Sequence, residues 1–189
     1  EAEAKADAAF AQWMNEVDQL QDLRQRDPAA ALSAVLSRRG RWPPLRAGQD
    51  ALLQARCALQ AGTARMMLGD LAPARADLDD VERWLAAPAL LSAPDALRHQ
   101  ALRCGIAAAN AKAALAHGQG DLASALRAYL QALDLARSIG EQRFEAHLLT
   151  NVATSFEESG LPTEALEHAR QALALAQALD LQELQGDIH

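Results

Sequence analysis

The chain has 189 residues, half of them hydrophobic but only 4% aromatic, and its formal net charge is -7. This length allows one sizeable core, and the richness in Ala and Leu favours helices over strands. The acidic balance argues against a nucleic-acid-binding protein, which would carry a basic stripe.

The sequence also bears on compartment and on membrane contact. No run of 18 apolar residues occurs, so we expect no membrane contact by this segment. The chain begins at Glu1 without a methionine, which indicates a processed product or a piece of a larger protein. A cytoplasmic location is the expectation, although a removed signal segment would leave no trace.

Cys57 and Cys104 are too few for a disulfide framework and are expected to be buried thiols, with a single bridge between them left open.

The first predicted hairpin covers residues 4–40. Its first helix has one apolar stripe at spacings of three and four, made by Phe10, Trp13, Val17, Leu20 and Leu23. Asp27 then caps a second helix that begins at Pro28, because proline suits the first helical position. That helix is predicted to end near Gly40.

Three further hairpins are predicted over residues 47–86, 95–139 and 141–184. Pro43 and Pro44 separate the first two hairpins, because consecutive prolines do not continue a helix. The turns within the later hairpins are expected at Gly69, Gly120 and Gly160. An insert is expected at residues 87–94, since the second and third hairpins align only with 11 extra residues between them.

The third and fourth hairpins are two copies of one pattern, 40 residues apart. The first copy carries Ala113, Ala116, Gly120, Ala125, Leu126, Ala132, Leu133 and Ala136. The second carries Ala153, Phe156, Gly160, Ala165, Leu166, Ala172, Leu173 and Ala176. A fixed period of this size indicates stacked units that bury their apolar faces against one another. We therefore predict an all-α solenoid of eight helices in four hairpins, forming a single domain over residues 1–189.

The fourth hairpin resembles a tetratricopeptide repeat, with Ala153, Phe156, Gly160, Ala165 and Ala172 at the family's positions. HEAT-like repeats share the period, but glycine at the turn and alanine in the second helix favour the tetratricopeptide pattern. The resemblance implies a right-handed superhelix whose first helices line a concave groove for a peptide or partner domain, and it implies no catalysis. The period is similar to a longer bacterial subgroup. The segment 27–32 resembles the N-terminal regulatory region of some GGDEF-type diguanylate cyclases.

No catalytic, cofactor-binding or metal-binding pattern is found in the sequence. Phosphate-binding loops, nucleophile elbows and zinc-spaced Cys and His residues are all missing. The five histidines are scattered, and no two of them lie four residues apart. We therefore predict a chain that is not an enzyme and that needs no cofactor.

Polar residues on the first helices of the later hairpins are the candidate groove. Residues seven apart share a helix face, and Arg143 follows Arg103 by the 40-residue period. The predicted groove comprises Arg56, Thr63, Arg103, Asn110, Arg143, His147, Asn151 and Thr154. Several arginines suit acidic or carboxylate-bearing peptides. Hydrated scaffold positions are the alternative interpretation.

The last helix carries a second candidate surface. A terminal repeat without a polar cap exposes the face that a further repeat would cover. Either the full protein continues beyond His189 or this end pairs with another copy, and we predict self-association, as a homodimer, through Leu173, Leu179 and Leu181. The leading hypothesis is a non-catalytic interaction module that serves as the regulatory part of a larger bacterial signalling protein. The alternatives are a freestanding scaffold and a small-molecule sensor with its ligand between the second and third hairpins.

Overall fold

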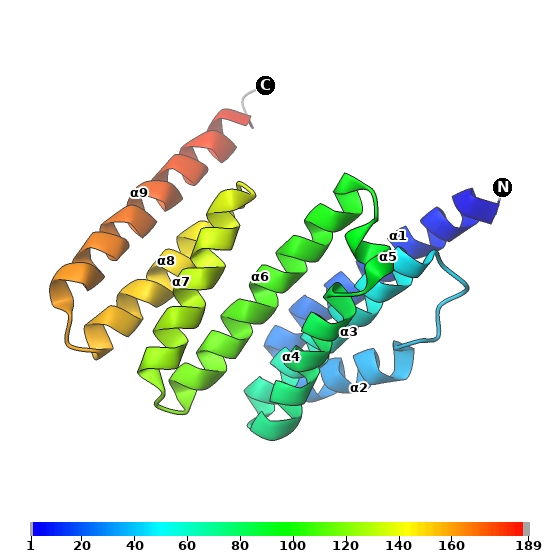
Figure 1. Cartoon of the computed structure of the whole chain (residues 1–189), viewed down its shortest axis with the longest axis horizontal. Helices are drawn as coiled ribbons and strands as arrows, with labels where there is room; N and C mark the ends of the chain where they lie inside the picture. Colours follow the sequence, from blue (N-terminus) through cyan, green and yellow to red (C-terminus); the bar gives the residue numbers. More distant parts are fainter. Residues whose placement is uncertain (1, 187–189) are drawn as a thin grey trace. The chain divides into compact units, whose positions relative to one another are not determined.

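The computed structural model describes the backbone of residues 2–186 and the side chains of residues 2–180. This part of the chain is helical and contains no strand, and its helices pack in consecutive pairs (Figure 1). The prediction of an all-α fold built from solenoid-type hairpins is confirmed. The chain divides into two compact units, residues 1–108 and 109–189. The single domain over residues 1–189 stays a prediction.

The first unit contains α1 (Ala2–Arg26), α2 (Pro28–Arg38), α3 (Ala47–Leu68), α4 (Leu71–Leu85), α5 (Pro88–Leu91) and the start of α6 (Asp95–Gly118). In the described part of the chain, α5 is the one helix beyond the eight predicted. It forms within the predicted insert because Pro88 opens the turn and Leu90 is buried against the rest of the unit. Since α5 packs against α3, the insert acts as a packed spacer.

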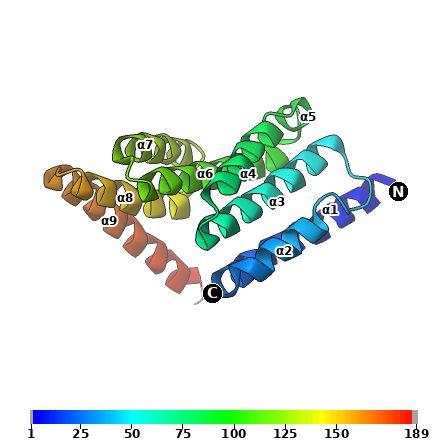
Figure 2. The same ribbon diagram turned by 90° about the horizontal axis from the view of Figure 1, so that it is seen from below.

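The first hairpin follows the local signals of its sequence. Asp27 caps α2 by accepting a hydrogen bond from the Ala30 backbone N–H at 2.9 Å. The apolar stripe of α1 buries Val17 and Leu20 in a cluster with Val35 of α2 and residues of α3. Figure 2 shows α1 and α2 beside α3, with which both are in contact. This cluster is the core of the first hairpin.

The second unit contains the rest of α6, α7 (Leu122–Ser138), α8 (Gln142–Glu158) and α9 (Pro162–Gly186). Gly120 and Gly160 form the turns inside its two hairpins, with φ of 80° and 75°. This left-handed conformation suits glycine, which lacks the Cβ that would clash there. Within the unit, α8 packs against both α7 and α9. Among residues 2–186, no helix combines the length and the apolar character needed to cross a membrane.

Candidate functional site

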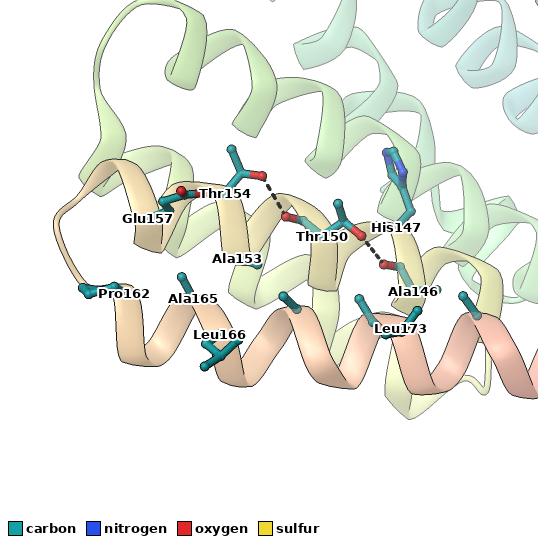
Figure 3. A pocket seen from close by; sticks show the side chains of 13 residues that line it. Ala146, His147, Thr150, Ala153, Thr154, Glu157, Pro162, Ala165, Leu166 and Leu173 are labelled. Atoms are coloured by element: carbon teal, nitrogen blue, oxygen red, sulfur yellow. Dashed lines mark hydrogen bonds between the residues drawn. The ribbon is translucent and has the colours of Figure 1, made fainter.

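An open groove of about 750 Å³ runs between α8 and α9 in the second unit (Figure 3). Residues along one face of α8 form its first wall, at spacings of three and four: Ala146, His147, Thr150, Ala153, Thr154 and Glu157. Because such spacing keeps side chains on one side of a helix, the wall extends along the helix axis.

The second wall is a stripe of small and branched apolar residues on α9: Pro162, Ala165, Leu166, Ala169, Ala172, Leu173 and Ala176. Five of these positions alternate spacings of four and three along the helix. This is the spacing by which helices pack knobs into holes. The α9 face of the groove therefore has the pattern of a helix-packing surface.

The leucines of this stripe are exposed although they are apolar. Leu166 keeps 51% of its surface exposed and Leu173 keeps 58%. Ala165 and Ala172, by contrast, are buried at 8% and 9%. Exposed leucines beside buried alanines make this stripe a candidate interaction surface.

Polar groups lie mainly on the α8 wall. The Thr150 hydroxyl donates to the Ala146 carbonyl, and the Thr154 hydroxyl to the Thr150 carbonyl, each at 3.1 Å. Both threonines therefore present a methyl group and an oxygen lone pair beside the groove. His147 and Glu157 are exposed near the two ends of the wall. The groove thus combines an apolar wall on α9 with a partly polar wall on α8, and protein interfaces combine apolar and polar surface in the same way.

Residues 105–178 match the family model of the tetratricopeptide repeat. The match covers most of the two hairpins formed by α6 with α7 and by α8 with α9, which we call the third and fourth repeats. Tetratricopeptide repeats generally mediate protein–protein interaction and are generally not enzymes. The match therefore supports a protein-interaction module. No match to the chain was found among curated proteins.

The third and fourth repeats bring several predicted groove residues together. Nδ2 of Asn151 donates a hydrogen bond to the side-chain oxygen Oδ1 of Asn110 at 2.8 Å, which joins α8 to α6. His147 and Thr154 line the groove between α8 and α9. Arg143 is exposed on α8. Of this set, His147 and Thr154 are the ones placed on the open groove.

The predicted residues of α3 contact α1 instead. Arg56 forms an ion pair with Asp18, and burial lowers the pKa of its guanidinium. The Thr63 hydroxyl accepts a hydrogen bond from Nη1 of Arg24 at 2.7 Å. Both side chains thereby hold α1 on α3 within the first unit. Arg103, also in the first unit, is exposed on α6.

The three leucines predicted for self-association differ in their surroundings. Leu173 lines the groove and is exposed. Leu179 is half-buried on α9. The Leu181 side chain lies outside the described residues. Self-association through these residues stays a prediction.

The alanines of the groove were not among the predicted site residues. Ala146 and Ala153 on α8, and Ala169 and Ala176 on α9, make the space between the two walls because their side chains are small. For the two alanines on α9, the signal in the sequence is the alternating spacing of four and three along that helix. Among the described residues, no group of three or more His, Cys, Asp or Glu could hold a metal ion.

Proposed function

We propose that this chain is a non-catalytic protein-interaction module whose groove between α8 and α9 receives an α-helix of a protein partner. The observation that carries the proposal is the apolar stripe from Pro162 to Ala176, whose Leu166 and Leu173 are exposed beside small alanines. Burying these leucines would contribute roughly 1.5–3 kcal/mol each, less the part of each side chain that is already buried.

The shape of the groove favours a helix over a small molecule. At about 1.5 Å of rise per residue, the stripe on α9 is roughly 20 Å long. That length matches about four turns of helix. Alanines let the axis of an incoming helix approach to about 8–10 Å, while the leucines insert beside its ridges. An extended peptide would match the spacing of the stripe less well, because its side chains recur every second residue.

The test is site-specific photocrosslinking in the cells in which this protein naturally occurs. A photoreactive residue replaces Leu173 in the groove or, as the matched control, Leu91 on α5, which is 63% exposed outside it. We expect a discrete adduct from position 173 and none from position 91. Equal labelling from both positions, or none from position 173, would contradict the proposal.

A second candidate is that the partner is another copy of this chain. His147 and Glu157 lie near opposite ends of the α8 wall. An antiparallel copy related by a twofold axis would bring each His147 beside the other copy's Glu157. Light scattering over a tenfold concentration range tests this candidate. A dimer that Leu173→Glu splits would support it, and a monomer throughout would exclude it.

We also propose that the module is the regulatory part of a larger signalling protein, such as a diguanylate cyclase. The support is the resemblance of segment 27–32 to regulatory regions of such enzymes, together with the 40-residue period. A bound helix would then set the state of an attached output domain. The sequence encoded after residue 189 in the gene tests this context directly, and a gene without an output domain would argue for a freestanding adaptor.

A further inference from the structure

Among the described residues, the third repeat has a helix, α8, packed against it at a place where the fourth repeat has none. The second helix of the third repeat, α7, packs against α8. Two polar contacts also join α6 to α8, from Asn110 to Asn151 and from His117 to Glu158. Since the two repeats share one pattern 40 residues apart, α8 is a template for what the groove of the fourth repeat accepts.

Equivalent residues in the two repeats differ sharply in exposure. Leu133 of α7 is 1% exposed, whereas its equivalent Leu173 on α9 is 58% exposed. Ala136 is fully buried, whereas its equivalent Ala176 is exposed. In the third repeat α8 packs against α7, and among the described residues no further helix follows α9. We attribute the difference in exposure to this packing.

The polar contacts between α6 and α8 show which positions of a seated helix would face polar residues of the groove. The equivalent of His117 is Glu157, and the equivalent of Asn110 is Thr150. In the third repeat, His117 faces the carboxylate of Glu158. In the fourth repeat the residue at that place is itself a carboxylate, so a glutamate on the incoming helix would be repelled. A lysine or arginine there would be attracted instead.

At one position the two repeats carry residues of different size, and this difference bears on the side chain that a seated helix would place there. Tyr129 of α7 is 5% exposed, and its pKa is raised by burial and by the negative charge of Glu158. Its equivalent on α9 is Ala169, which lines the groove. On α8, Ser155 is buried one turn before Glu158, on the same side of the helix. Because Glu158 is near enough to raise the pKa of Tyr129, we infer that position 155 of a seated helix is the one that meets Tyr129 in the third repeat and Ala169 in the fourth. A small residue suits a place beside a tyrosine, whereas a bulky one would fill the space left by an alanine.

We propose that the groove seats a helix of another protein that resembles α8, with a cationic side chain facing Glu157 and a bulky apolar side chain over Ala169. This proposal rests on the proposed function and specifies the chemistry of its partner. An apolar anchor in a pocket, with a charge at the rim, is the usual division between affinity and specificity in interfaces.

The probes that test it are capped peptides with the sequence of residues 141–158. One probe carries Ser155→Phe, and a second carries Ser155→Phe with Glu158→Lys. Fluorescence anisotropy measures their Kd for the whole chain and for four variants. Glu157→Lys reverses the charge at the end of the α8 wall. Ala169→Tyr fills the space above Ala169, and Leu173→Glu places a charge on the apolar α9 wall. Glu167→Lys, at an exposed α9 residue outside the groove lining, is the matched control. Circular dichroism verifies that each variant is folded.

We expect the lysine probe to bind the unmodified chain about three- to tenfold more tightly than the glutamate probe, as for a partly exposed charge pair. Glu157→Lys should invert that preference, while Glu167→Lys should preserve it. Ala169→Tyr should weaken binding of both phenylalanine probes, and Leu173→Glu should weaken it at least tenfold. This combination separates the charge at the end of the α8 wall from the general charge of the chain.

The contrary outcomes separate the two proposals. Binding that Leu173→Glu and Ala169→Tyr abolish, but that ignores the probe charge, would overturn the stated chemistry and leave the groove as a helix seat. Binding that persists in both variants, or no binding by either probe, would overturn the proposed chemistry of the partner. If the crosslink at position 173 were also missing, the proposal that the groove receives a helix would be overturned as well. A dimer of the unmodified chain that Leu173→Glu splits would assign the groove to a second copy and overturn the proposal of a separate partner.

Discussion

Asp77 is a buried carboxylate on α4, only 6% exposed, and its Oδ2 accepts a hydrogen bond from Nη1 of Arg65 on α3 at 2.7 Å. Burial raises the pKa of Asp77, and the nearby Arg65 opposes part of that rise. A raised pKa means that the folded state binds the proton more tightly than the unfolded chain does. The stabilisation from protonation is therefore complete below the unfolded pKa and is lost as pH rises through the folded pKa.

Asp77→Asn should change the pH dependence of folding in a direction set by this sign. As pH falls from 7 towards the ordinary value of 3.8, the unmodified chain gains stability from Asp77, and the variant does not. The free energy of unfolding of the unmodified chain should thus rise relative to that of the variant. Urea unfolding at a series of pH values measures the difference. Asp70→Asn, at an exposed residue before α4, is the control, and a pH-independent difference for Asp77→Asn would contradict the prediction.

Close packing of α3 against α4 depends on a glycine in the middle of a helix. A Cβ at Gly62 would lie 3.1 Å from both Cγ and Cδ2 of Leu78, and 3.2 Å from the Cβ of Asp77. The equivalent positions in the third and fourth repeats carry Ala113 and Ala153. All three hairpins therefore carry a small residue at this place of the repeat, and α3 carries the smallest.

Relative to Gly105→Ala, Gly62→Ala should destabilise the first unit by about 1–3 kcal/mol, because the added methyl overpacks the contact with Leu78. Gly105→Ala is the matched comparison within the same unit. A Cβ at this position would meet only Cδ1 of Leu85, at an ordinary 3.5 Å. The higher helix propensity of alanine should therefore stabilise the folded first unit by roughly 0.5–1 kcal/mol. Urea unfolding monitored by circular dichroism gives both values. Equal effects from the two substitutions would contradict the packing argument.

At the scale of the whole molecule, both cysteines are free thiols and report on the opening of the first unit. Cys57 and Cys104 are fully buried, and burial raises the pKa of each to about 11. At pH 8 few of these thiols are ionised, and a reagent reaches them only when the unit opens.

Labelling with a coloured disulfide reagent at pH 8 should therefore be slow in the folded chain and should reach two thiols per chain in denaturant. The rate should increase as the pH is raised towards 11, since more thiolate forms. Fast labelling of the folded chain at pH 8 would show that the unit opens readily. Fewer than two thiols in denaturant would indicate that the cysteines are bridged.

The sequence by itself determined the helices and their pairing into hairpins. The apolar stripe of α1, the Asp27 cap, and the turn glycines Gly120 and Gly160 all act between residues near in sequence, so their spacing is legible there. The short α5 escaped prediction because its formation depends on the burial of Leu90 in the first unit.

Only the tertiary structure decided which surface stays open. Spacing put Arg56 and Thr63 in a groove, but Asp18 and Arg24 of α1 contact them, and these partners are distant in sequence. The repeat pattern gave Leu133 and Leu173 the same place in a hairpin, yet the first is buried and the second exposed. Local periodicity identifies the apolar face of a helix, whereas the burial of that face depends on which other helix packs against it.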